Sequence, residues 1–315
     1  MDRTADPKSA AAAPAADRRG GRARVTALAL GAVLAGPVVL AGAAPALARP
    51  APVTASAAAA AATGGPSAPV AAGPASARCQ APFVPAYFWS GKIWRQAIAS
   101  KPAPRDIILD VTGTGAGNSP EPHFQALVRR ARARGIAVLG YSSTEYGRRP
   151  AAAVRADVRH YRSWYHVDGM FLDLVAGTAR RLPYYRRLAR YIRQDTTGSV
   201  IWLNPGVFPG RGYMSAGDVV MVFEGSYASY RHFRVPGWSR HYRAARFAHV
   251  IYAASRAQLS QAISLTRSKR AGQVFITGRS GAPGTNPYGG LPWYWAQEDT
   301  ALTAGCPPAT GTSGS

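Results

Sequence analysis

The stretch "VDGMFLDLV", residues 167–175, predicts the fold of this chain because it is almost continuously apolar. An apolar run of this length, with no polar alternation, is typical of a strand buried on both faces, as in a parallel sheet. Asp173 interrupts the run close to its end. A buried carboxylate is unfavourable unless a partner or a function requires it. We therefore expect a parallel strand that delivers Asp173 to its C-terminal end.

Seven further strand-like runs follow the same pattern, and helical periodicity separates several of them, as in residues 124–131. Alternating strands and helices predict a parallel sheet, and eight units in roughly 220 residues fit a single-domain (β/α)8 TIM-type barrel. An open doubly wound sheet is the alternative, but it requires a glycine-rich loop after the first strand, where only Ser90 and Gly91 stand. The helices after the first, fifth and sixth strands are short or poorly marked. The expected strands are 82–89, 106–111, 137–142, 167–174, 200–204, 218–224, 247–253 and 273–277.

The N-terminal quarter of the chain differs in composition from the rest. A basic stretch at 18–24 precedes an apolar stretch at 25–48 that ends in Ala-Leu-Ala, which is typical of a secretory signal. An uncleaved membrane anchor is the alternative for the apolar stretch. Small residues and proline then dominate, as in disordered linkers. The expected boundaries are 1–48 for the signal peptide or anchor, 49–78 for an Ala/Pro-rich linker, 79–308 for the barrel domain and 309–315 for a flexible tail.

The only two cysteines, Cys79 and Cys306, bracket the predicted barrel. In an exported protein a single pair is expected to form a disulfide, and two free thiols are the alternative. We therefore expect a secreted or cell-surface protein that touches a membrane only through an uncleaved N-terminal segment.

The chain is strongly basic, with 38 Lys and Arg against 15 Asp and Glu and a formal net charge of +23. Such a surface attracts anionic polymers. The arginines are spread over helix faces and loops, without a basic stripe interleaved with stacking aromatic residues and without a nucleic-acid motif. The sequence therefore predicts a cationic surface with no specific nucleic-acid partner. We also expect the protein to be a monomer.

Four of the scarce carboxylates lie at or just beyond strand C-terminal ends, where barrel enzymes place their chemistry: Asp110, Glu145, Asp173 and Glu224. Two carboxylates that flank a cavity can cleave a glycosidic bond, one as the acid and one as the base or nucleophile. Asp173 and Glu224 are the expected pair, and a separation above about 12 Å would exclude it. The acids at strand starts, expected to pair with arginines or cap helices, are Asp106, Asp168 and Asp218.

Aromatic and polar residues at strand ends can contact a sugar, because aromatic rings stack on sugar faces and their polar groups bind hydroxyls. Tyr288 and Trp293 belong to this aromatic set, part of which is expected to pack in the core. The histidines show no metal-binding spacing and no G-x-S-x-G motif is present, so neither a metal nor a cofactor is expected. The expected substrate contacts are Tyr87, Asp110, Tyr141, Arg148, Asn204 and Tyr227.

The series "VPAYFW", "GYSSTEYGRR", "DVRHYRSWYHVDGMFLDL", "LNPG", "VVMVFEGSY" and "TGRSGAPGTNPYGGLPWYW" resembles the spherulation-specific family 4 (spherulin-4-like) proteins. The resemblance covers most of 82–298 and implies a (β/α)8 barrel related to endo-α-1,4-polygalactosaminidases, which act on galactosamine-containing polysaccharide. It places the family's strand-four acidic pair on Asp173 and the next residue, and its strand-six glutamate on Glu224. The second acid of the pair is replaced by Leu174 in this chain.

The sequence thus predicts an exported glycoside hydrolase that cleaves a polysaccharide or oligosaccharide with Asp173 and Glu224, without assigning which is the acid. A neutral, acetylated or anionic glycan is as open as a cationic one, because a basic protein repels deacetylated galactosamine polymers. A non-catalytic glycan-binding barrel at the cell surface is the alternative, and Leu174 favours it. A third hypothesis is a cationic wall-associated protein in which the barrel is only a scaffold.

Overall fold

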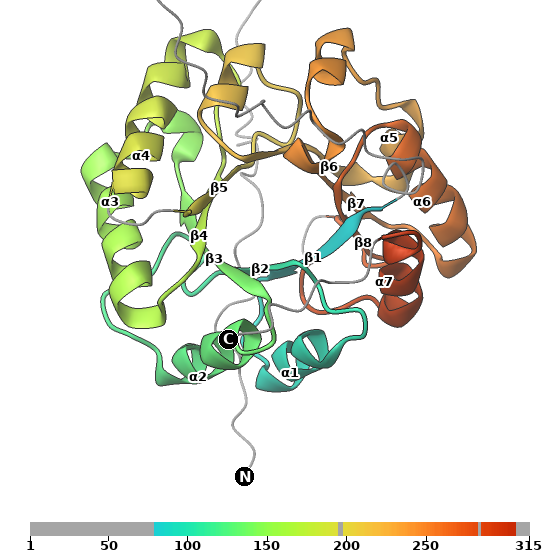
Figure 1. Ribbon diagram of the computed structural model, residues 1–315, viewed down its shortest axis with the longest axis horizontal. Helices are drawn as coiled ribbons and strands as arrows, with labels where there is room; N and C mark the ends of the chain where they lie inside the picture. The colour runs from blue at the N-terminus through green and yellow to red at the C-terminus, as the bar shows by residue number, and fades with distance from the viewer. Residues whose placement is uncertain (1–78, 195–197, 283–284, 307–315) are drawn as a thin grey trace, which may run out of the picture. The chain divides into compact units, whose positions relative to one another are not determined.

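The computed structural model describes residues 79–194, 198–282 and 285–306. The expected signal peptide, linker and C-terminal tail lie outside these residues. In the described part, eight parallel strands form a closed barrel in the order β1 to β8, and helices surround it (Figure 1). The (β/α)8 prediction is confirmed, and the doubly wound alternative is wrong because β1 pairs with β8.

The eight strands lie where the apolar runs predict them, although several are shorter. They are β1 (Ala81–Ala86), β2 (Asp106–Leu109), β3 (Ala137–Ser143), β4 (Gly169–Asp173), β5 (Val200–Leu203), β6 (Val219–Ser226), β7 (Phe247–Tyr252) and β8 (Gln273–Ile276). The strand pattern of the sequence extends past the last paired residue because the loops at these ends are also partly apolar. Trp89, for example, follows β1 outside the ladder.

Seven α-helices accompany the strands in the described part of the chain. They are α1 (Gly91–Ala99), α2 (Pro122–Arg132), α3 (Ala151–His160), α4 (Leu182–Gln194), α5 (Tyr227–His232), α6 (Leu259–Ser268) and α7 (Trp295–Thr303). The structure explains two of the three weak helical signals, those after the fifth and sixth strands, whereas α1 after the first strand has 9 residues. A 3-10 turn, η4 (Arg211–Ser215), replaces an α-helix between β5 and β6, and α5 has only 6 residues.

Aromatic side chains fill the interior of the barrel. Trp202 of β5 is fully buried, and its ring lies 5.0 Å from that of Phe83 of β1 and 6.4 Å from that of Phe171 of β4. Phe275 of β8 completes the contact at 6.3 Å from Phe83. Because these rings come from opposite sides of the barrel, they close its centre and leave the site to the strand ends.

Close packing of β4 against β5 explains why residue 169, within the stretch 167–175, is a glycine. A Cβ atom on Gly169 would lie 2.1 Å from the carbonyl oxygen of Val200 on β5. Any larger residue would push β4 and β5 apart. This glycine therefore fixes the position of the strand that ends in Asp173.

The acids at two strand starts pair with arginines, as the sequence predicts. Asp168 accepts hydrogen bonds from Arg132 at 3.0 Å and from the backbone N–H of Val138 at 2.9 Å. Asp218 accepts from Arg193 at 2.9 Å and from the backbone N–H of Ile201 at 2.8 Å. In each case the acid just before one strand accepts from the N–H of the second residue of the strand before it.

A disulfide between Cys79 and Cys306 joins the residues before β1 to those after α7, with Cα atoms 4.5 Å apart. The predicted pairing is therefore present, and the described part of the chain holds no free cysteine. The disulfide ties the two ends of the barrel domain together. None of the helices in the described ranges has the length and apolar composition to cross a membrane.

Candidate active site

Asp173 and Glu224 meet at the barrel mouth, meaning the face formed by the C-terminal ends of the strands. Asp173 is the last residue of β4, Glu224 lies near the end of β6, and Asn204 follows β5 directly between them. The amide Nδ2 of Asn204 donates to Oδ1 of Asp173 and to Oε2 of Glu224, each at 2.8 Å. Two such contacts to one nitrogen place these carboxyl oxygens within about 5.6 Å of each other. This is well below the 12 Å limit for a working pair.

Two tyrosines bind the remaining oxygen of each carboxylate. The hydroxyl of Tyr141, on β3, donates to Oδ2 of Asp173 at 2.6 Å. The hydroxyl of Tyr288, in the loop between β8 and α7, donates to Oε1 of Glu224. The ring of Tyr87 lies between them, with centroids 5.5 Å from Tyr141 and 5.2 Å from Tyr288. Both carboxylates are therefore held on two sides by neutral donors.

Burial controls the protonation of this cluster. It raises the pKa of Asp173 from 3.8 to about 6, and the nearby charge of Glu224 adds to the shift. The hydrogen bonds from Tyr141 and Asn204 lower the same pKa, because they favour the carboxylate. Burial also raises the pKa of Tyr87, Tyr141 and Tyr288 above 10.0, so these hydroxyls stay protonated and can donate.

Leu174 occupies a strained position directly after Asp173. Its φ angle is +46°, a left-handed conformation that disfavours a leucine. The hydroxyl of Thr144 donates to the backbone carbonyl oxygens of both Asp173 and Leu174 at 2.8 Å. The backbone N–H of Tyr146 donates to the carbonyl oxygen of Leu174 at 2.6 Å. These bonds hold the strained turn and thereby fix the end of β4. Strain of this kind is found preferentially at functional sites.

A buried ion pair stabilises the neighbouring loop between β2 and α2. Arg149 donates to Oδ2 of Asp157 at 2.7 Å, and the hydroxyl of Ser142 donates to the same oxygen at 2.6 Å. Asp157 Oδ1 accepts from the backbone N–H of Ala116 at 3.3 Å. The pair thus links β3, α3 and the loop beside the mouth.

The other expected site residues lie in different surroundings. Asp110 follows β2 and accepts from the backbone N–H of Gly113 at 2.7 Å, so it shapes its own loop. Arg148 is exposed, and its guanidinium lies 5.6 Å from the ring centre of Tyr146. The arginine that pairs with a carboxylate is the next residue, Arg149, which bonds Asp157. Tyr227 is buried at the start of α5 and donates to Oε1 of Gln261 at 2.6 Å, away from the two carboxylates.

Tyr288 is the residue of this cluster that sequence reasoning left outside the expected contacts. It lies in a loop without helical or strand periodicity, and the signals for it were its position among the aromatic residues after late strands and its place in the family-like stretch 277–295. Asn204 was expected to contact a sugar, but its place between the two carboxylates depends on β5 lying between β4 and β6. In the described residues no group of three or more His, Cys, Asp or Glu side chains is arranged to hold a metal ion.

Comparisons with known proteins agree with this architecture. The model of the spherulation-specific family 4 matches residues 83–301. Spherulin-4 of Physarum polycephalum is 28% identical over 233 residues, which covers 70% of each chain. The crystal structure of Aspergillus clavatus Sph3, solved in complex with GalNAc, is similar with a TM-score of 0.61 at 21% identity, and the match covers 71% of this chain and 98% of Sph3. This structural likeness supports the barrel fold.

Proposed function

The chain belongs to the spherulation-specific family 4, and from this premise and the geometry of the barrel mouth we propose that it is a glycoside hydrolase. Asp173 and Glu224 are its catalytic carboxylates in this proposal. The observation that carries it is the amide of Asn204, which bonds both carboxylates at 2.8 Å. A purely structural acid would be expected to pair with an arginine, as Asp168 and Asp218 do at the opposite end of the barrel.

The environments of the two acids support different roles. Burial beside Glu224 raises the pKa of Asp173 to about 6, so a large fraction of it is protonated in mildly acidic solution. We therefore assign Asp173 as the general acid that gives its proton to the leaving glycosidic oxygen. Glu224, held by Tyr288 and Asn204, then attacks or stabilises the anomeric carbon.

The spacing of the carboxylates favours retention of the anomeric configuration. Retaining enzymes hold their carboxylates about 5–5.5 Å apart, and inverting enzymes about 6.5–9.5 Å apart to admit a water molecule. Asn204 holds one oxygen of each carboxylate within about 5.6 Å of the other, and we take this close approach as support for the first class. In the second step Asp173, now a carboxylate, accepts a proton from the water that releases the sugar from Glu224.

The surface of the mouth supports a polymeric substrate. The large apolar side chains that are exposed in the described residues all follow C-terminal strand ends, so they lie on the catalytic face. A polysaccharide offers several sugar rings to such a surface, whereas a single sugar reaches few of them. These residues are Trp89, Tyr146, Leu174, Val207 and Trp293.

We propose that the polymer contains N-acetylated galactosamine. Sph3, with the same fold, was solved with GalNAc. An acetylated amine carries no charge, so the net charge of +23 would not repel it as it would a deacetylated polymer. We further propose that the protein acts outside the cell as an exported barrel domain, which its disulfide supports.

A glycan-binding barrel without hydrolysis is the second candidate. Leu174 favours this candidate, because the family resemblance implies an acid at position 174. Asp173 nevertheless keeps the hydrogen bonds described above, and none of them involves the Leu174 side chain. The two candidates therefore differ in whether bound glycan is cleaved.

Incubation with a panel of acetylated and deacetylated galactosamine polymers, followed by measurement of new reducing ends, tests the proposal. The single variants Asp173→Asn and Glu224→Gln should each lose at least about a hundredfold in rate. Glu121→Gln removes a charge from the end of the loop between β2 and α2, where the Glu121 backbone N–H donates to the Tyr165 hydroxyl and not to the carboxylate pair, so it is the matched control and should keep full activity. Cleavage that survives both substitutions would overturn the site assignment, and binding without cleavage would establish the second candidate.

A further inference from the structure

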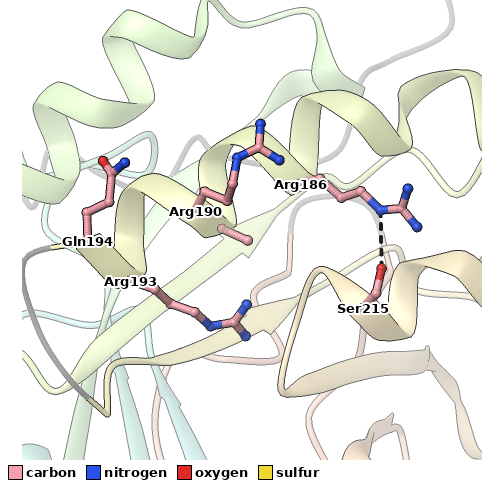
Figure 2. Close-up of a pocket in the computed structure, with 6 residues that line it drawn as sticks. Arg186, Arg190, Arg193, Gln194 and Ser215 are labelled. Carbon is pink, nitrogen blue, oxygen red and sulfur yellow. Dashed lines mark hydrogen bonds between the residues drawn. The ribbon is translucent and has the colours of Figure 1, made fainter. Parts of the chain in front are cut away.

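A groove lies on the outer side of the barrel between α4 and η4, and Figure 2 shows its lining. Its volume is about 600 Å³. One lining residue, Arg193, pairs with Asp218, which stands before β6 and therefore at the end of the barrel opposite the mouth. The groove is thus separate from the catalytic carboxylates. Its lining residues are Arg186, Ala189, Arg190, Arg193, Gln194 and Ser215.

Helical spacing explains why three arginines share this groove. Arg186, Arg190 and Arg193 stand at i, i+4 and i+7, which places them on one face of α4. Figure 2 shows Arg186 and Arg193 reaching toward the side of η4, and Arg190 extending from the helix between them. The Nε atom of Arg186 donates to the hydroxyl of Ser215 at 3.2 Å. The face is therefore positioned by η4 and remains open to solvent.

The positive charge of the groove is only partly neutralised. Arg193 pairs with Asp218 at 2.9 Å, and both side chains stay exposed, at 42% and 45%. Asp218 already accepts a second bond from the backbone of Ile201. Arg190 makes no hydrogen bond, ion pair or ring contact with any residue that the structure describes. Among the described residues, one carboxylate therefore pairs with one of the three guanidinium groups.

The surrounding sequence reinforces this imbalance. Between residues 176 and 217 the chain has seven arginines and a single acid, Asp195. At the same time the lining contains no aromatic ring that could stack on a nucleic-acid base. Gln194 and Ser215 supply neutral hydrogen-bonding groups of the kind that bind sugar hydroxyls.

We propose that this groove is a second glycan site, which binds the carboxylate or sulfate groups of an acidic polysaccharide. Guanidinium groups bind such planar or tetrahedral anions through paired N–H donors. Spacing along one helix face lets successive arginines contact successive acidic groups of one chain. Because the groove lies away from the mouth, the site would attach the protein to an anionic matrix and leave the mouth free for its own substrate.

Binding measurements with defined polymers test this site. The triple variant Arg186→Gln, Arg190→Gln, Arg193→Gln removes three charges from the groove. The control variant Arg129→Gln, Arg130→Gln, Arg134→Gln removes three exposed charges on and beside α2, on another part of the barrel. The probes are fluorescently labelled polygalacturonate for carboxylates, dextran sulfate for sulfates, neutral dextran as a blank and random single-stranded DNA, each at low and moderate salt.

The groove variant should weaken binding of at least one acidic polysaccharide by about tenfold or more, since charged contacts of this kind dominate affinity for polyanions. The control should change it less than about threefold, and neutral dextran should not bind. A preference for polygalacturonate or for dextran sulfate identifies the acidic group. Equal losses in the two variants, no binding of either polymer, or tighter binding of DNA would overturn the proposal. Hydrolysis at the mouth plays no part in the assay, so failure of the hydrolase proposal leaves it intact.

Discussion

The hydroxyl group of Tyr288 donates a hydrogen bond to Oε1 of Glu224, although 64 residues separate the two in the chain. Burial and the charge of Glu224 hold the pKa of Tyr288 well above 10.0, so the tyrosine is a donor at any physiological pH. The loop after β8 is therefore part of the face that carries the proposed catalytic pair. Through Asn204 and Tyr141 the same chain of bonds continues to Asp173.

Replacing Tyr288 by phenylalanine should lower kcat/KM by about tenfold, because a hydrogen bond to a charged group contributes roughly 1.5–3 kcal/mol. The loss should fall mainly on kcat, since Glu224 then lacks one of its two donors. Tyr227→Phe is the matched control, because Tyr227 bonds Gln261 and not the carboxylates. Equal effects of the two substitutions would contradict a special role for Tyr288.

Asn204 should control the pH dependence of activity. Its hydrogen bond lowers the pKa of Asp173, so Asn204→Ala should raise that pKa above its present value of about 6. Asn204→Asp adds a further negative charge and should raise it more. A general acid works while protonated, so the alkaline limb of the kcat/KM profile should move to higher pH in the order wild type, Ala, Asp. Unchanged limbs with a uniformly lower rate would indicate only a structural role.

The strands could be predicted because burial on both faces leaves a continuous apolar run, and the scarcity of acids made Asp173 and Glu224 stand out at strand ends. The role of Asn204 could not be predicted in the same way. Its bond to both acids exists only because β5 lies between β4 and β6 in the closed barrel. A sequence specifies that Asn204 follows a strand, but the partners of its amide are set by the register of three strands.

Loop residues were harder to place for a related reason. Tyr227 follows β6 by only one residue and was expected at the mouth, but α5 begins there and turns the side chain toward Gln261 of α6. Tyr288 lies in a loop with no periodic pattern, so no regular element predicts its direction. Arg149 and Arg148 are adjacent, and only the fold determines which of them reaches Asp157.

Leu174→Asn should stabilise the protein. Asparagine tolerates a φ angle of +46° better than leucine, and the left-handed conformation costs an ordinary residue roughly 1–2 kcal/mol. The leucine side chain is 37% exposed, so little apolar burial is lost. We expect the free energy of unfolding in urea to rise by about 1 kcal/mol. Leu174→Ala, which keeps the strain, should show no gain, and a gain with alanine would place the cause elsewhere.

Asp299 should make stability fall as pH rises. It is fully buried in α7, neither of its carboxylate oxygens has a hydrogen-bond partner among the described residues, and burial raises its pKa from 3.8 to about 7. Between these two values the folded state binds the proton more tightly than the unfolded state does, so the free energy of unfolding decreases as pH increases. Above pH 7 this contribution becomes constant.

Denaturant unfolding of the wild type and of Asp299→Asn between pH 4 and 8 measures this effect. Over this range the titration of Asp299 should lower the free energy of unfolding of the wild type by up to about 4 kcal/mol. Asparagine cannot ionise, so this contribution should be absent in the variant. The difference between the two proteins, and not the absolute slope, is diagnostic, because burial also raises the pKa of Glu298 and Asp106. Parallel curves would show that Asp299 stays protonated or solvated in both states.

Trp293 should distinguish long substrates from short ones. Its side chain is 70% exposed in the loop before α7, 5.6 Å from the guanidinium of Arg256, so it contributes little to the core. Tyr288 of the same loop contacts Glu224, so we expect the Trp293 ring to offer a stacking surface on this face outside the carboxylate pair. Trp293→Ala should raise KM for the polymer by about five- to tenfold, since stacking of an aromatic ring contributes roughly 1 kcal/mol or more. The kcat value and the rate on short oligosaccharides should change little, because those substrates do not extend to this residue. Equal losses on short and long substrates would show instead that Trp293 supports the loop that carries Tyr288, and a matching fall in Tm would confirm that explanation.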